Sequence, residues 1–178
     1  FLLAGSKVVL LDIRKKNLDN VSKKIKKLGK FDHLCLKVDS TKKNDHIQAL
    51  KKILKKYNSI DVVINGSGIN SSVDFLKIKE KDWNEVIKSQ LHSTFLSCQI
   101  FGQYMIKNKK GSIINISSAS SGPPLSKAFA YSASKSAIKN LTQNLAREFA
   151  KYNVRVNSLR PGFFPTKWNL KNFIDKNR

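Results

Sequence analysis

Short apolar runs alternate with longer amphipathic segments along the chain. The runs have the length of strands, and the segments carry apolar residues at helical spacing with lysines between them. Strands are predicted at about 7–11, 31–38, 60–64, 112–116 and 154–158, and helices at about 18–28, 42–57, 81–108 and 128–152. Strands that alternate with helices of this length predict an α/β fold with a parallel sheet covered by helices on both faces.

Polar side chains follow these strands directly. Asp12, Asp39 and Asn65 end the first three runs, and Ser118 and the turn Pro161-Gly162 follow the last two. In parallel sheets, ligands bind beyond the carboxyl ends of the strands. The pattern therefore predicts one cleft that collects these residues.

The length of 178 residues and the hydrophobic fraction of 40% suit one soluble domain with a core of its own. No apolar stretch approaches the roughly 20 residues that a membrane span needs. The two cysteines, Cys35 and Cys98, lie far apart in no metal-binding or disulfide pattern, so we expect no metal site and a reducing, cytoplasmic location.

The net charge of +22 is the most unusual property of the sequence. A protein that binds nucleic acid or an anionic membrane is one explanation. Arginine, which nucleic-acid sites favour, contributes only five of the 34 basic residues. The lysines fall between apolar residues at helical spacing, as on a solvated outer face, and this favours a lysine-rich surface without a nucleic-acid partner.

The most informative constellation is formed by Ser118, Tyr131 and Lys135. Spacing of four residues places Tyr131 and Lys135 on one helix face, where the ammonium can stabilise a phenolate. A free tyrosine has a pKa of about 10, and a neighbouring positive charge brings it toward the range of efficient proton transfer. Ser118 can hydrogen-bond the substrate oxygen while Tyr131 exchanges its proton.

With Asn65-Gly66-Ser67-Gly68, Asn115–Ser118 and Pro161–Thr166, this constellation resembles the classical short-chain dehydrogenase/reductase family over essentially the whole chain. The resemblance implies a Rossmann-type, doubly wound parallel sheet and hydride transfer between a nicotinamide cofactor and a carbonyl or alcohol. It implies that Tyr131 is the general acid/base, that Lys135 also holds the nicotinamide ribose, and that Ser118 orients the substrate. The cofactor residues that it implies are Asp12, Asp39, Asn65, Gly66, Ser67, Gly68, Tyr131, Lys135, Pro161, Gly162 and Thr166.

The chain departs from the family pattern at its start, because no G-x-x-x-G-x-G loop precedes the strand at 7–11. We expect residues 1–178 to be one partial NAD(P)-binding Rossmann domain. The first strand with its glycine-rich loop and the C-terminal strand are expected to be absent from this chain. The resemblance places the missing first strand in the middle of the sheet, so the sheet is expected to divide between the strands at 7–11 and 60–64.

A second departure is Gln90, which aligns with the family's active-site asparagine on the long helix. The asparagine supports a water that relays protons, and glutamine keeps the amide but is one methylene longer. The departures leave open a catalytically dead scaffold protein as one alternative function.

Asp12 ends its strand where a carboxylate can accept hydrogen bonds from the adenosine ribose and repel a 2′-phosphate, which favours NAD over NADP. The basic residues Arg14, Lys15 and Lys16 could neutralise such a phosphate, so NADP stays possible. By family position, Asp39 would bind the adenine amino group.

The likeness extends to members that act on sugar acids and polyols, such as fructuronate reductases and gluconate 5-dehydrogenases. Polar contacts to such a small-molecule substrate would come from Asn70, Ser71, Ser120, Lys167 and Asn169. A 3-oxoacyl-carrier-protein reductase is the alternative within the family. The resemblance also implies a homo-oligomer, either a dimer or a tetramer.

Overall fold

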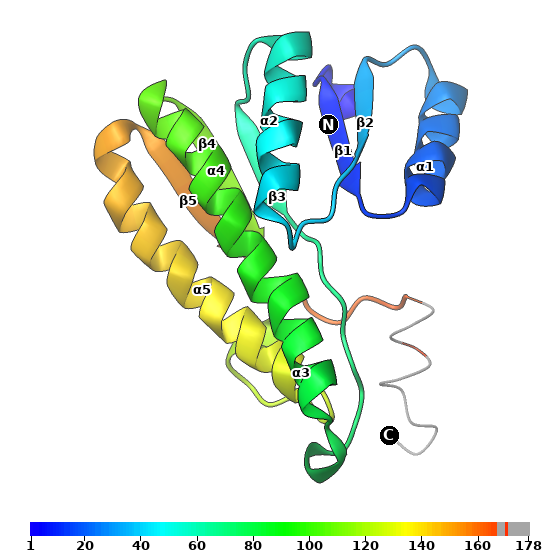
Figure 1. The fold of residues 1–178 in the computed structure, drawn as a ribbon, viewed down its shortest axis with the longest axis vertical. Coiled ribbons are helices and arrows are strands. Elements are labelled where there is room, and N and C mark those ends of the chain that lie inside the picture. Colours follow the sequence, from blue (N-terminus) through cyan, green and yellow to red (C-terminus); the bar gives the residue numbers. More distant parts are fainter. Residues whose placement is uncertain (167–169, 171–178) are drawn as a thin grey trace. The chain divides into compact units, whose positions relative to one another are not determined.

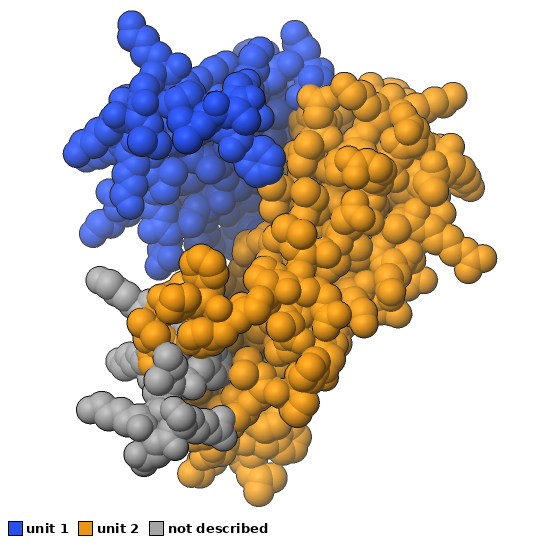
Figure 2. Space-filling view, turned by 180° about the vertical axis from the view of Figure 1, so that it is seen from behind, with its two compact units in different colours: residues 1–59 blue, residues 60–178 orange. Residues whose placement is uncertain are grey.

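The computed structural model describes residues 1–166 and residue 170. The chain forms two compact units, Phe1–Ser59 and Ile60–Arg178 (Figure 2). Each contains its own parallel sheet, with strand order β1-β2 in unit 1 and β3-β4-β5 in unit 2. The division of the sheet between the strands near 7–11 and 60–64 is confirmed. The grouping of residues 1–178 into a single domain stays a prediction.

Unit 1 consists of two consecutive strand–helix pairs (Figure 1). Its elements are β1 (Val8–Asp12), α1 (Lys15–Leu28), β2 (His33–Lys37) and α2 (Lys43–Tyr57), after a 3-10 turn at Leu2–Ala4. Helix α1 packs against both strands and buries Leu18 and Ile25. It ends at Gly29, whose φ of +146° is rarely adopted by residues with a side chain.

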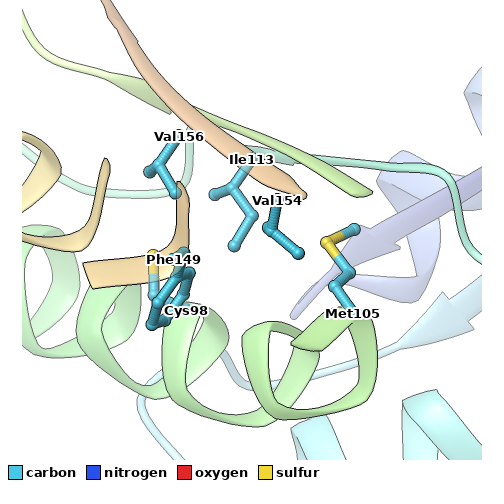
Figure 3. Close-up of a cluster of buried hydrophobic side chains, with 6 residues drawn as sticks. All are labelled: Cys98, Met105, Ile113, Phe149, Val154 and Val156. Carbon is cyan, nitrogen blue, oxygen red and sulfur yellow. The ribbon is translucent and has the colours of Figure 1, made fainter. Parts of the chain in front are cut away.

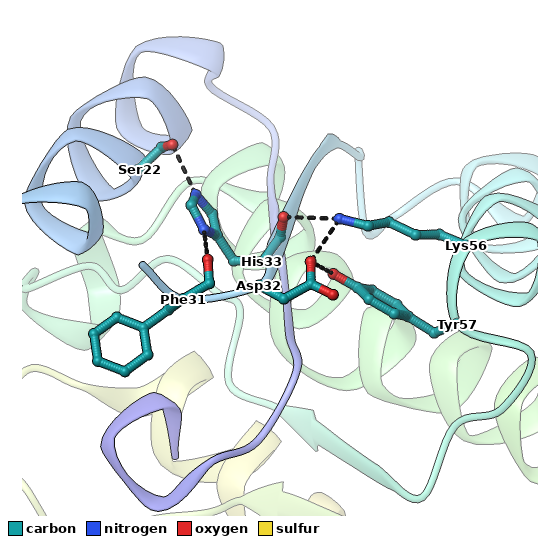
Figure 4. Close-up of polar contacts among 6 residues, drawn as sticks. All are labelled: Ser22, Phe31, Asp32, His33, Lys56 and Tyr57. Atoms are coloured by element: carbon teal, nitrogen blue, oxygen red, sulfur yellow. Dashed lines mark hydrogen bonds and ion pairs between the residues drawn. The ribbon is translucent and has the colours of Figure 1, made fainter. Parts of the chain in front are cut away.

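Polar contacts tie the helices of unit 1 to the start of β2 (Figure 4). His33 Nε2 lies 2.8 Å from Ser22 Oγ of α1. At the end of α2, Lys56 Nζ and Tyr57 Oη donate to Asp32 Oδ1 at 2.8 and 2.9 Å. Both hydrogen bonds lower the pKa of the Asp32 carboxyl. Because Asp32 and Lys56 are exposed, this cluster orients α2 more than it stabilises the fold.

Unit 2 contains β3 (Val62–Asn65), β4 (Gly111–Ile116) and β5 (Val154–Leu159), all parallel. Its helices are α3 (Glu80–Ile87), α4 (Ser93–Lys107) and α5 (Phe129–Phe149), with a π-helical turn at Lys88–His92 between α3 and α4. Shorter 3-10 turns lie at Phe75–Lys77, Ala119–Ser121 and Ala150–Tyr152. The single long helix predicted at 81–108 is therefore interrupted by the π-helical turn.

The core of unit 2 lies between the sheet and helices α4 and α5 (Figure 3). It is formed by Cys98, Met105, Ile113, Phe149, Val154 and Val156. Met105 and Ile113 are completely buried. A Cβ at Gly111 would overlap the Met105 side chain, so glycine is required for this close approach.

Helices α4 and α5 cover one face of the unit 2 sheet, whereas we predicted cover on both faces. Val62 and Ile64, which point away from the core, remain 46% and 47% exposed. Cover on both faces predicts that the strand at 7–11 is buried, yet no residue of β1 is fully buried and Leu11 is 40% exposed. Among the described strands, β5 also has a single neighbour, yet its Val154 and Val156 are buried against α5, so helix packing on a face decides how far its apolar side chains are covered. No helix in the described part of the chain is long and apolar enough to cross a membrane.

Candidate active site

Ser118 lies just beyond the end of β4, where it caps the 3-10 turn Ala119–Ser121. Its Oγ accepts hydrogen bonds from Ser120 N at 3.2 Å and from Ser120 Oγ at 3.0 Å. A hydroxyl can accept two bonds and donate one. Ser118 therefore keeps its own hydrogen for an oxygen of a bound molecule.

Tyr131 and Lys135 lie in the first turns of α5, as the four-residue spacing predicts. Lys135 Nζ is 5.4 Å from the centroid of the Tyr131 ring, and it donates to Ile116 O at 2.6 Å. Lys135 is only 4% exposed, and this desolvation lowers its pKa to about 8. At pH 7 the side chain still carries its charge, held beside the tyrosine ring.

A pocket of about 290 Å³ brings Ser118 and Tyr131 together. It is lined by Asn70, Ser118, Ala119, Ser120, Pro123, Pro124, Leu125, Tyr131, Gly162 and Phe163. Its volume lies near the lower limit for small-molecule sites, which combine apolar walls with a few polar groups. The predicted residues Ser118, Tyr131 and Gly162 thus share one site, together with the substrate candidates Asn70 and Ser120.

Gln90 lies in the π-helical turn, a feature that is often found at functional sites. It is 4% exposed, and its Nε2 donates to Ile69 O at 2.8 Å. Gly68, with φ of +154°, lies against the Gln90 amide, and a Cβ at this position would overlap it. Gln90 Oε1 is buried without a hydrogen-bond partner among the described residues. The longer side chain thus reaches the loop after β3 and retains one free acceptor.

Asn65 belongs to a buried polar network that crosses the unit 2 sheet. Its Nδ2 donates to Asn115 Oδ1 at 2.9 Å, and Asn115 Nδ2 donates to Thr142 Oγ1 at 3.0 Å. Cys98 Sγ also donates to Asn115 Oδ1, and burial raises the pKa of this thiol to about 11. Asn115 is completely buried. The network holds the end of β3, and with it the Gly66-Ser67-Gly68 turn, against β4.

We did not single out Asn115 as a site residue on its own, nor Thr142. The sequence feature that points to Asn115 is an amide within the apolar strand 112–116, because a buried polar group requires hydrogen-bond partners. Ser117 has a similar role, since its Oγ donates to Lys135 O at 2.7 Å and ties α5 to the end of β4.

The two predicted aspartates lie in unit 1. Asp12 accepts from Arg14 N at 2.7 Å and from Asn17 Nδ2 at 3.0 Å, and the Asn17 bond is the main cause of its lowered pKa. Asp39 Oδ1 accepts from both Thr41 N and Thr41 Oγ1, in a turn that leads into α2. Both carboxylates lie at the carboxyl ends of their strands, as predicted.

The loop after β5 carries the remaining predicted residues. Pro161 O accepts from Ala119 N at 2.9 Å, which joins this loop to the one that bears Ser118. Thr166 N donates to Phe164 O at 2.7 Å. Lys167 and Asn169 lie outside the described residues. No group of three His, Cys, Asp or Glu side chains within the described residues could hold a metal ion.

Known proteins resemble this chain in sequence and in fold. The family model for short chain dehydrogenase matches residues 1–177. The 3-oxoacyl-(acyl-carrier-protein) reductase FabG of Thermotoga maritima is 36% identical over 172 residues, which cover 96% of this chain and 69% of the relative. The NAD-dependent glycerol dehydrogenase of Listeria innocua is 36% identical over 167 residues, which cover 94% of this chain and 64% of the relative.

Among solved structures, a putative gluconate dehydrogenase from Agrobacterium tumefaciens superimposes with a TM-score of 0.91 at 24% identity. The match covers 99% of this chain and 69% of that structure, so the α/β fold of Rossmann type is confirmed. The chain spans about two thirds of the length of these relatives. On the family match and the shared fold, the chain belongs to the short-chain dehydrogenase family.

Proposed function

We propose that this chain carries the catalytic site of an NAD(H)-dependent oxidoreductase that interconverts a carbonyl and a secondary alcohol in a polyol or sugar acid. The observation that carries the proposal is the shared pocket of Ser118 and Tyr131, with the Lys135 ammonium beside the tyrosine ring. The names of the glycerol and gluconate dehydrogenases support the substrate class.

In the reductive direction, the Tyr131 hydroxyl donates its proton to the carbonyl oxygen while the carbonyl carbon receives a hydride. Ser118 donates a hydrogen bond to the same oxygen and polarises the carbonyl. The Lys135 charge stabilises the phenolate that forms. The free acceptor of Gln90 would hold a water that returns a proton to the site.

A nicotinamide cofactor, when bound, supplies the hydride in reduction and accepts it in oxidation. Lys135 Nζ makes one hydrogen bond in the structure and has two further N–H groups for the hydroxyls of a ribose. Asn65, Gly66, Ser67 and Gly68 would line the adenosine side, and Pro161, Gly162 and Thr166 the nicotinamide side. Asp12 would bind the second ribose and Asp39 the adenine. No glycine-rich phosphate loop occurs among the 178 residues, so these side chains fit only the ends of the cofactor.

A reductase that acts on acyl thioesters is the second candidate. It is favoured by the apolar pocket wall of Pro123, Pro124, Leu125 and Phe163, and by the FabG relative. Asp12 opposes it, since such reductases usually prefer NADP.

The full-length protein should be assayed with glycerol, gluconate-type acids and acetoacetyl thioesters, each with both cofactors. We expect turnover of the hydroxylated compounds with NAD(H). Faster turnover of the thioesters with NADPH would replace the first proposal by the second, and no turnover with any pair would contradict both.

A further inference from the structure

The loop that follows β3 is fixed at its start by two neighbouring side chains of the π-helical turn. Ser89 Oγ accepts from Ile69 N at 3.1 Å, and Gln90 Nε2 donates to Ile69 O at 2.8 Å. Both backbone groups of one loop residue are thereby satisfied by consecutive residues of the turn. Ser89 Oγ also donates to Val86 O at 3.1 Å, which fixes its own orientation.

The same loop is fixed a few residues later against the start of α5. Val73 N donates to Lys127 O at 3.2 Å, and Lys127 Nζ lies 3.4 Å from Asp74 Oδ1. The rings of Phe75 and Phe129 meet edge to face, with centroids 5.1 Å apart. An exposed ion pair contributes little, so the aromatic pair is the stronger of these two contacts.

Asn70 lies between these two attachments and lines the same pocket as Ser118 and Tyr131. Its Oδ1 accepts from Ser71 N at 2.8 Å. This bond uses the acceptor of the amide and leaves Nδ2 as a hydrogen-bond donor on a loop held at both ends. In a pocket of about 290 Å³, a small molecule that reaches Tyr131 also lies close to Asn70.

We propose that Asn70 is a specificity-determining residue, whose Nδ2 donates to a substrate hydroxyl on the carbon next to the reacting one. The preferred substrates would then be 1,2-diols and α-hydroxy ketones. Ser89 acts as a positioning residue, because it holds Ile69 and thus the backbone that presents Asn70. This inference rests on the proposed function and names the substrate feature that the site selects.

The test compares two alcohols that differ by one hydroxyl, butane-2,3-diol and butan-2-ol, in the full-length protein with NAD. We expect the wild type to favour the diol in kcat/KM by about tenfold, the upper range for one neutral hydrogen bond. Asn70→Ala and the similarly sized Asn70→Leu should reduce this ratio to about one. Asn84→Ala, on the exposed surface of α3, is the matched control and should keep the full ratio.

A wild type without preference for the diol, or Asn70 variants that keep it, would overturn the assignment. Calorimetry with acetoin and butanone, the corresponding ketones, measures the same preference in binding. If neither alcohol is turned over, the proposed function fails, whereas the calorimetric preference still decides the role of Asn70.

The positioning role has a separate readout. Ser89→Ala should raise KM for butane-2,3-diol about threefold, leave kcat for butan-2-ol unchanged, and accelerate amide hydrogen exchange at residues 69–74. Ser89→Thr keeps the hydroxyl and should return both the KM for butane-2,3-diol and the amide exchange rate to their wild-type values. Unchanged exchange and an unchanged KM in Ser89→Ala would exclude Ser89 as a positioning residue.

Discussion

The two compact units of this chain are built from similar strand and helix patterns but differ in how they bury them. In unit 1, no residue of β1 or β2 is fully buried. In unit 2, β4 and β5 bury residues against two helices, and Ile113 is completely enclosed. Unit 2 has a third strand and a second covering helix, and these enclose its core. The smaller sheet of unit 1 stays partly exposed.

Among the described residues, most buried polar side chains belong to unit 2, whereas unit 1 buries His46. Unit 2 encloses Gln90, Asn115, Ser117 and Lys135 and pairs them with specific partners. Unit 1 keeps its main ion pair, Asp32 with Lys56, at the exposed surface. Buried hydrogen bonds hold side chains in one arrangement, which proton transfer requires. We expect unit 2 to determine the rate and unit 1 to adjust cofactor preference.

The largest expected effect is the loss of turnover in Tyr131→Phe of the full-length protein. Removal of a general acid lowers the rate by about 10²–10⁴-fold, whereas NADH binding, measured by fluorescence titration, should remain nearly intact. Tyr104→Phe on α4 serves as the control. A Tyr131→Phe variant that kept more than about a tenth of the wild-type rate would remove Tyr131 from the mechanism.

The packing difference predicts that Met105→Ala destabilises the protein far more than Leu11→Ala. Met105 is fully buried in the core of unit 2, so its truncation should cost about 2–5 kcal/mol. Leu11 is 40% exposed in unit 1, and its loss should cost less than about 1 kcal/mol. Urea denaturation of both variants measures the loss in free energy of unfolding. Equal losses would contradict the difference in packing between the two units.

Lys135→Met should raise the stability of the protein and abolish its activity. The pKa of Lys135 falls from 10.5 when unfolded to about 8 when folded, so below pH 8 the buried charge opposes folding. Its replacement by methionine should raise stability at pH 7 by about 1–3 kcal/mol while turnover and cofactor binding are lost.

The pH dependence follows from the same shift. Between pH 8 and 10.5 the unfolded state binds more protons at Lys135 than the folded state does, so this residue makes the free energy of unfolding rise with pH. The advantage of Lys135→Met should therefore shrink across this window and vanish above it. Thermal denaturation from pH 7 to 10.5 tests this, and a constant difference would contradict the buried charge.

The smallest effect concerns Asp12, whose charge should oppose a 2′-phosphate. Two like charges about 4 Å apart cost roughly 4 kcal/mol at an effective dielectric constant near 20, and exposure of Asp12 reduces this. Asp12→Ser should lower the NAD to NADP ratio of kcat/KM by about tenfold, with Arg14 available for the phosphate. Asp32→Ser, in the same unit, should leave the ratio unchanged. Equal use of both cofactors by the wild type would refute this preference.

The sequence predicted each strand and most helix ends to within a few residues, because apolar periodicity and glycine stops act locally. It missed the π-helical turn at 88–92, since the apolar stripe continues through residues 81–108 without a proline or glycine at that point. It also predicted a buried strand at 7–11, where the structure leaves Leu11 40% exposed. An apolar run indicates that a strand can be buried, whereas the helices that pack on its faces decide whether it is: β5 has one neighbouring strand, yet Val154 and Val156 are buried against α5.

The sequence alone indicated the family and the candidate chemistry through Ser118, Tyr131 and Lys135. Ser118 follows a strand, and the four-residue spacing places Tyr131 and Lys135 on one helix face, so local pattern is enough to identify them. Only the tertiary structure decided that Asn65 meets Asn115 across 50 residues, that Lys135 is desolvated, and that Gln90 reaches Ile69. Such contacts depend on how distant segments pack, and local periodicity carries no information about the distance between their atoms.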